Sequence, residues 1–141
     1  MIQPKWKLDH TAHAVIDIDA AIKFYQEVAG LQLRSRETLE DQAVELAFLG
    51  SENAETSIEL ISPTNESSSV HTFLQKRSEG LHHICFAVDD IDFELTRLAA
   101  ESIKLVDPIA RRGAAGKKIA FLHPKSCLGV LIELCQGGHS D

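Results

Sequence analysis

The stretch that decides the fold is LDHTAHAVIDID, residues 8–19, because a similar stretch, LHHICFAVDDID, occupies residues 81–92. When the two are aligned, His10 matches His83 and Asp17 matches Asp90, an offset of 73 positions (83 minus 10). The same offset brings Ala47-Phe48-Leu49 onto Ala120-Phe121-Leu122. After one inserted residue, Ile58-Glu59-Leu60 falls on Ile132-Glu133-Leu134. Matches spread over both halves indicate one module that occurs twice.

Each half is predicted to run strand, helix, then further strands. In the first half Asp17 or Asp19 can cap a helix with an apolar stripe from Ile18 to Val28, and Gly30 can end it. Its counterpart begins near Asp90, with no glycine at its end. Strands are expected near 8–16, 43–49, 57–62, 81–88, 117–122 and 129–135, and weaker ones near 31–36 and 103–107. The polar linker 63–79 includes a predicted short helix at 70–76.

These patterns predict an α+β fold of two tandem βαβββ modules, about residues 7–62 and 80–136, which form a cupped mixed sheet. At 141 residues the chain has the length of a single domain, which we expect to span residues 1–141.

Charge and cysteine content limit the partners and the compartment. The formal net charge is −7, which argues against a nucleic acid or an anionic membrane as partner. No run approaches the roughly 20 apolar residues that a membrane-spanning helix needs. Three cysteines cannot all pair within one chain, and Met1-Ile2-Gln3-Pro4-Lys5 does not resemble a secretory signal. We therefore expect a cytoplasmic protein.

Strand alternation places four polar side chains on one face of the predicted sheet. His10 shares its face with Ala12, and His83 shares its face with Cys85, while Glu59 and Glu133 lie between apolar neighbours that point the other way. A carboxylate that faces inward is costly unless it is paired, protonated or bound to a cation. His10, Glu59, His83 and Glu133 therefore predict a site for one divalent metal ion, with Zn, Co, Ni, Mn and Fe all suitable.

The alternative for a single histidine in a strand is a purely structural role, which is the commoner case. Occurrence at equivalent positions of both modules favours metal binding for His10 and His83. The other five histidines are predicted not to bind metal: His13, His71, His82, His123 and His139. Cys85 and Cys135 lie on the ligand face, so a thiolate ligand is a less favoured alternative.

The sequence resembles the vicinal oxygen chelate superfamily and, more narrowly, the methylmalonyl-CoA epimerase family, over roughly residues 7–136. The motifs that carry the resemblance are Leu8-Asp9-His10, Phe24-Tyr25, Gly80-Leu81-His82-His83-Ile84 and, most specifically, the run from Gly116 to Leu134. The resemblance implies a glyoxalase-like fold, one divalent metal ion, an acyl-CoA substrate and a homodimer. In that family the first-half ligand is often glutamine, whereas this chain has Glu59.

The resemblance also implies a reaction, the interconversion of (2R)- and (2S)-methylmalonyl-CoA through a metal-stabilised enolate. Inversion needs one acid–base group on each side of the planar intermediate, and we assign Glu45 and Glu133. Glu45 matches a family carboxylate and is expected to share the ligand face with Ala43 and Ala47. Its alternative is an edge glutamate paired with Lys118. The CoA phosphates could meet cations at the rim, which otherwise are ordinary surface charges: Arg111, Arg112, Lys117 and Lys125.

Three other functions use related sites. Glyoxalase I acts on a thiol-conjugated 2-oxoaldehyde with the same four donors, but His123-Pro124-Lys125-Ser126 stands where glyoxalases commonly have an Asp-Pro-Asp-Gly turn. An extradiol dioxygenase would bind iron through His10, His83 and Glu133, and Glu59 would then block the position that oxygen needs. A non-catalytic binding protein would not need four metal donors.

Overall fold

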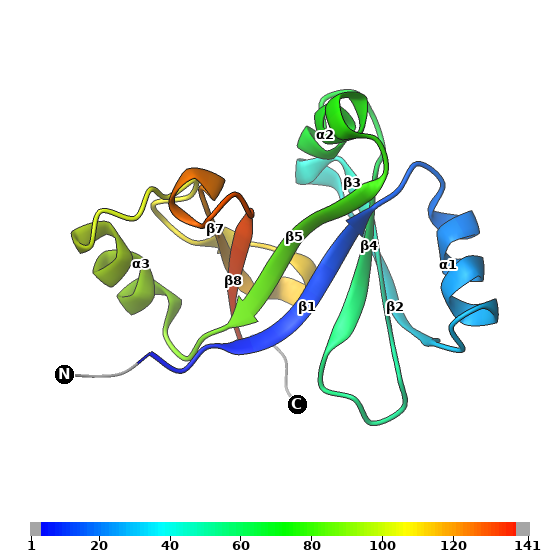
Figure 1. Ribbon diagram of the computed structural model, residues 1–141, viewed down its shortest axis with the longest axis horizontal. Coiled ribbons are helices and arrows are strands. Elements are labelled where there is room, and N and C mark those ends of the chain that lie inside the picture. Colours follow the sequence, from blue (N-terminus) through cyan, green and yellow to red (C-terminus); the bar gives the residue numbers. More distant parts are fainter. Residues whose placement is uncertain (1–3, 138–141) are drawn as a thin grey trace. The chain divides into compact units, whose positions relative to one another are not determined.

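The computed structural model describes residues 4–137 and divides them into two compact units. The first unit is His10–His82; the second consists of the described residues up to Asp9 together with those from His83 onward. Each unit carries helices and four strands (Figure 1).

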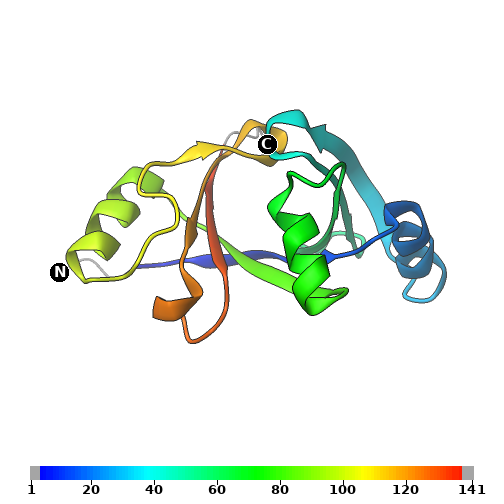
Figure 2. The same cartoon turned by 90° about the horizontal axis from the view of Figure 1, so that it is seen from above.

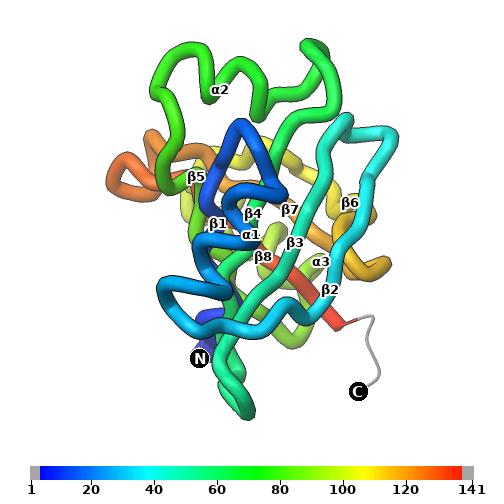
Figure 3. Tube along the Cα trace, turned by 90° about the vertical axis from the view of Figure 1, so that its right-hand side faces the viewer, coloured from blue at the N-terminus to red at the C-terminus, as the bar shows by residue number. Residues whose placement is uncertain are grey.

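The first unit builds a mixed four-stranded arrangement. Its elements are β1 (Lys7–Ala14), α1 (Ile18–Glu27), β2 (Gln32–Leu39), β3 (Val44–Gly50), β4 (Ser57–Pro63) and α2 (Ser69–Arg77). The strand order is β2-β3-β4-β1, in which β1 and β4 are parallel and the other neighbours antiparallel. Figure 3 shows β2 and β3 running side by side. A short 3₁₀ turn at Glu40–Gln42 joins these two strands.

The second unit repeats this plan. Its elements are β5 (Gly80–Ala87), α3 (Ile91–Ala100), β6 (Arg111–Arg112), β7 (Lys118–Leu122) and β8 (Ile132–Gln136), with 3₁₀ turns at Ala114–Gly116 and Pro124–Ser126. The order is β5-β8-β7-β6, again with one parallel pair, β5 and β8. The predicted α+β class and the two βαβββ modules are confirmed.

The two outermost strands differ from the prediction. Residues 32–39 form a longer strand than expected, whereas the strand predicted at 103–107 is wrong. That segment contributes a single bridge, between Leu105 and Leu122, and its next two backbone N–H groups both donate to the carbonyl of Phe121. Pro108 follows and cannot donate to a ladder, so the pairing resumes only at Arg111–Arg112.

Helix boundaries follow the expected capping chemistry. The Asp17 carboxylate accepts a hydrogen bond from the Ala20 N–H at 3.1 Å, and the Asp90 carboxylate accepts one from the Phe93 N–H at 3.1 Å. Past the end of α1, Gly30 has φ +71°, a left-handed conformation that suits glycine. Past α3 the left-handed residue is Ser102, with φ +66°, so this helix end carries strain that a glycine would avoid.

Each major helix covers one face of its own strands. In the first unit Ile18 and Ile22 of α1 pack with Ala47, Leu49 and Leu60, and Figure 2 shows α1 beside the start of β2. In the second unit α3 packs equivalently on β7 and β8, with the buried residues Ile91, Leu95, Leu98, Ala120, Leu122 and Leu134. The opposite faces of these strands are therefore left for other side chains.

The linker helix predicted at 70–76 is present as α2, and Ser68 caps it by accepting from the Val70 N–H. None of the helices in residues 4–137 has the length and apolar character needed to cross a membrane.

Candidate metal centre

The first candidate donor pair joins β1 and β4 on the face that α1 does not cover. The Nε2 atom of His10 lies 3.1 Å from a carboxylate oxygen of Glu59, and the two residues are only 6% and 5% exposed. The ring of Phe48 meets the His10 imidazole edge to face, with centroids 5.2 Å apart. Phe48 stands directly opposite Glu59 in the β3–β4 ladder, so it shares the face of the pair.

The second pair has the same construction in the second unit. Nε2 of His83 on β5 lies 3.0 Å from a carboxylate oxygen of Glu133 on β8, and both residues are buried. Phe121 meets the His83 ring edge to face at 5.3 Å and stands opposite Glu133 in the β7–β8 ladder. The repeat seen in the sequence is therefore also a repeat of side-chain geometry.

The donor types and spacings suit a divalent cation. Zinc binds histidine nitrogen and carboxylate oxygen at about 2.0–2.2 Å, so two such ligands on one ion lie from about 3.0 Å apart at 90° to about 3.4 Å apart in a tetrahedral site. The two His–Glu pairs, at 3.1 and 3.0 Å, lie at the short end of this range. Burial makes a charged carboxylate costly, and a cation offsets that cost. Each unit thus supplies one half of the predicted donor set.

Glu45 does not lie where the sequence analysis placed it. It does share a face with Ala47, but Ala47 packs in the core beneath α1, and the ligand face of β3 carries Phe48 instead. The Glu45 carboxylate accepts hydrogen bonds from Arg36 at 2.8 and 2.9 Å, and Arg36 also bonds Asp19 of α1 at 2.8 Å. Glu45 and then Asp19 raise the pKa of the Arg36 guanidinium.

The face of Glu45 was predicted wrongly because both faces of β3 are apolar. The alternation of side chains along this strand therefore does not show which face points toward the candidate ligands. Lys118, the alternative partner suggested for Glu45, bonds Asp92 at 2.7 Å.

Comparison with known proteins decides the family. Residues 9–121 match the glyoxalase/bleomycin resistance protein/dioxygenase superfamily. The chain belongs to this superfamily. It is 40% identical over 129 residues to the mitochondrial methylmalonyl-CoA epimerase of Dictyostelium discoideum, covering 91% of this chain and 76% of that protein.

Solved structures of this superfamily agree with both the fold and the narrower resemblance. The methylmalonyl-CoA epimerase of Mycobacterium tuberculosis matches with a TM-score of 0.88 and 39% identity, over 92% of this chain and 87% of that one. A variant of the Streptomyces coelicolor methylmalonyl-CoA epimerase in complex with 2-nitronate-propionyl-CoA matches with a TM-score of 0.88 and 35% identity, over 94% and 98% of the two chains. The predicted glyoxalase-like fold and the resemblance to epimerases, which are isomerases, are confirmed.

Several histidines outside the candidate metal centre have partners of their own. Nδ1 of His13 lies 2.8 Å from the Tyr25 hydroxyl on the α1 side, the ring of His82 packs against Phe73, and His123 accepts a hydrogen bond from the Lys125 N–H. These contacts give them structural roles. His139 lies outside the described residues.

The two cysteines on the ligand face, Cys85 and Cys135, are both free and lie in one buried cluster. A hydrogen bond with Cys135, together with burial, raises the pKa of the Cys85 thiol above its ordinary value. This favours the protonated thiol of Cys85 over the thiolate that metal binding needs, whereas the same hydrogen bond lowers the pKa of the Cys135 thiol.

Phe48 and Phe121 were not among the residues predicted to form the site. Both residues occupy equivalent positions of the sequence repeat, which could have pointed to them. That match was used only to align the two modules. In the structure each ring restricts its histidine and helps to exclude water from the adjacent carboxylate.

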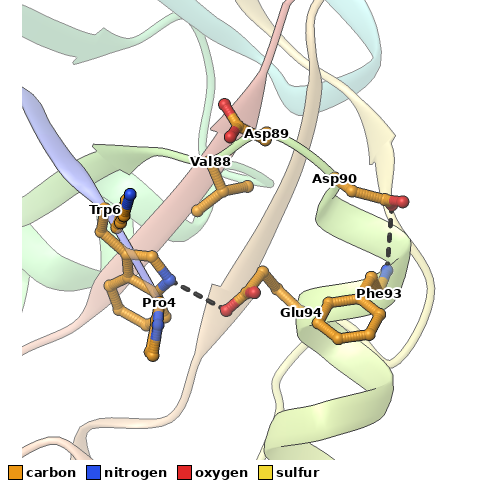
Figure 4. A pocket seen from close by; sticks show the side chains of 8 residues that line it. Pro4, Trp6, Val88, Asp89, Asp90, Phe93 and Glu94 are labelled. Carbon is orange, nitrogen blue, oxygen red and sulfur yellow. Dashed lines mark hydrogen bonds between the residues drawn. The ribbon is translucent and has the colours of Figure 1, made fainter. Parts of the chain in front are cut away.

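A hollow of about 390 Å³ lies at the start of α3 and is lined by Trp6, Asp90, Phe93 and Glu94, among others (Figure 4). Its Trp6 indole donates to Glu94 at 2.9 Å, and Glu94 also pairs with Arg97. The Glu94 carboxylate in this hollow thus ties Trp6 to α3.

Proposed function

We propose that this protein is a divalent-metal-dependent epimerase that interconverts (2R)- and (2S)-methylmalonyl-CoA. The observation that carries the proposal is the buried His–Glu pair found at equivalent positions of both modules. The similarity to proteins named methylmalonyl-CoA epimerase supports the choice of substrate.

We assign one metal ion, with Co, Zn, Ni and Mn as candidates, to four ligands: His10, Glu59, His83 and Glu133. When bound, such an ion acts as a Lewis acid that stabilises negative charge on the thioester oxygen. The histidines are held by their phenylalanine neighbours and need not reorganise on binding. This is the property expected of a site that stabilises developing charge.

We assign the proton transfers to the two ligand carboxylates, one from each module. Glu133 keeps its predicted role, whereas Glu59 replaces Glu45 because the Glu45 carboxylate is bound to Arg36 on the α1 side. Since the family often has glutamine at this position, the acid–base role of Glu59 is proposed for this chain and not for the family. In one direction the Glu133 carboxylate takes the proton from the carbon between thioester and carboxylate, and Glu59 in its protonated form returns one. The reverse reaction exchanges these two roles.

The test is hydrogen exchange at that carbon. We would add one epimer of methylmalonyl-CoA in deuterium oxide to chelator-treated protein and to Co- or Zn-loaded protein, and follow the α-hydrogen by NMR. Metal-dependent exchange with loss of optical purity, absent in His83→Ala, is the expected result. Absence of exchange with every metal would sink the proposal.

Glyoxalase I activity is the second candidate, because Glu59 completes the same four-donor set. The hemithioacetal of methylglyoxal and a low-molecular-weight thiol, assayed with the same metal-loaded protein, distinguishes the two. We also propose a single domain over residues 1–141, a homodimer and a cytoplasmic location. Light scattering of the purified chain tests the homodimer.

A further inference from the structure

One arginine lies on the same face as the second donor pair. Arg111 stands opposite Ile119 in the β6–β7 ladder, and Ile119 in turn stands opposite Cys135 of β8. Residues opposite one another share a face, so Arg111 lies on the face that carries Glu133 and Phe121. The apolar contact of Ile119 with Cys85 and Cys135 supports this placement.

The Arg111 guanidinium lies over the ring of Phe121. Its Cζ atom is 5.6 Å from the ring centroid, the range of a cation–π contact. Phe121 is also the ring that meets His83 edge to face. One aromatic ring therefore separates a positive charge from a candidate metal ligand.

Asp107 fixes this arginine in place. One carboxylate oxygen accepts from Arg111 Nε at 3.2 Å, and the other accepts from the backbone N–H of Phe121 at 2.9 Å. The same aspartate thus ties the guanidinium to the strand that carries its aromatic support. This bond uses Nε and leaves the two terminal nitrogens of the fork for a planar anion.

The site needs such a charge if it takes an acyl-CoA. The chain has a formal net charge of −7, and Glu133 adds a carboxylate to this face, so an anionic substrate is repelled at long range. A cation held in position offsets this repulsion and orients the ligand. Arginine suits the task because its fork matches carboxylate and phosphate oxygens.

We infer that Arg111 binds an anionic group of the substrate, either the free carboxylate of the malonyl moiety or a phosphate of CoA. This rests on the proposed function for the choice of ligand. Asp107 and Phe121 act as positioning residues. Arg112 provides the matched control, because it has the same charge and stands opposite Lys118, whose side chain bonds Asp92 of α3 on the other face.

Calorimetric binding of three non-epimerising probes to the full-length, metal-loaded chain tests the inference. The probes are malonyl-CoA, acetyl-CoA, which lacks the free carboxylate, and malonyl-pantetheine, which lacks the phosphates. For Arg111→Gln we expect roughly 10- to 100-fold weaker binding of malonyl-CoA, the range of charge-assisted hydrogen bonds, and for Arg112→Gln less than about a threefold change.

The pattern of losses identifies the anion. Weakening that affects both malonyl probes and spares acetyl-CoA assigns the carboxylate, and weakening that affects both CoA probes and spares malonyl-pantetheine assigns a phosphate. Equal affinities of wild type and Arg111→Gln for all three, or an equal loss in Arg112→Gln, overturn the inference. Because binding needs no turnover, the result is independent of whether methylmalonyl-CoA exchanges its α-hydrogen.

Discussion

The two glutamates considered as acid–base groups differ in what surrounds their carboxylates. Glu59 is buried beside His10, whereas Glu45 is bound to Arg36 on the α1 side. We expect Glu45→Gln to retain exchange within about threefold, since a partly exposed ion pair contributes only about 0–1 kcal/mol to stability. Glu59→Gln should lower exchange by at least about tenfold, because an amide cannot accept the proton.

Metal analysis of the two purified variants separates the loss of a base from the loss of the ion. The glutamine oxygen at position 59 can still bind a cation, so we expect metal content near that of wild type. Loss of exchange in Glu45→Gln with normal exchange in Glu59→Gln would reverse the assignment.

Among individual residues, the burial and the shared face of each proposed His–Glu ligand pair were predictable, and the face of Glu45 was not. His10, Glu59, His83 and Glu133 each follow from strand alternation combined with the repeat. On β3 the side chains do not show which face of the strand is which, because Leu46 and Ala47 are both buried although they point to opposite faces. Only the packing of α1 against one of those faces decides the matter.

At the scale of elements, the two major helices begin alike and end differently. Asp17→Ala should destabilise the protein by about 1 kcal/mol, because it removes the acceptor for the Ala20 N–H. Asp17→Asn, which retains a capping oxygen, should cost much less. Urea unfolding of both variants measures this, and equal losses would mean that charge rather than the cap hydrogen bond matters.

At the ends of the two helices, a second pair of substitutions should change the stability of the protein in opposite directions. Ser102→Gly should stabilise the protein by about 0.5–1 kcal/mol, because glycine adopts φ +66° without steric cost. Gly30→Ala should destabilise it by about 1 kcal/mol for the same reason. Thermal unfolding monitored by circular dichroism is sufficient, and a destabilised Ser102→Gly would show that the serine makes compensating contacts.

These elements also show what the sequence predicts well. Helices and strands with a clear stripe or alternation are where the residues indicated, whereas the pairing at 103–107 was not predictable. There the backbone donors converge on a single carbonyl, that of Phe121, which is a tertiary contact without a local signature.

At the scale of the whole molecule, one ion shared by both modules would respond to the loss of a single histidine differently from two separate ions. Metal binding should raise the melting temperature, with a stabilisation of about 2.7 kcal/mol when free metal is 100 times its dissociation constant. If both modules hold the same ion, His10→Ala and His83→Ala should each abolish most of this shift. A half-sized shift in either variant, or two ions per chain by mass spectrometry, would contradict a shared site.

Protons should compete with the metal at these four ligands. Imidazole nitrogen binds a cation only when deprotonated, so affinity should fall as the pH drops below about 6.5. Metal titrations at several pH values provide the measurement, and a flat profile between about pH 5 and 8 would argue against histidine ligands.

The hydrogen bond between the Trp6 indole and Glu94 places the start of the chain in the unit that otherwise begins at His83. A gene cut inside the linker would therefore not yield two self-sufficient halves. The C-terminal fragment would lack Trp6, the only tryptophan of the sequence, and with it the contact between that ring and Phe86. The two modules are thus alike in sequence, yet a single cut in the linker between them would not separate them.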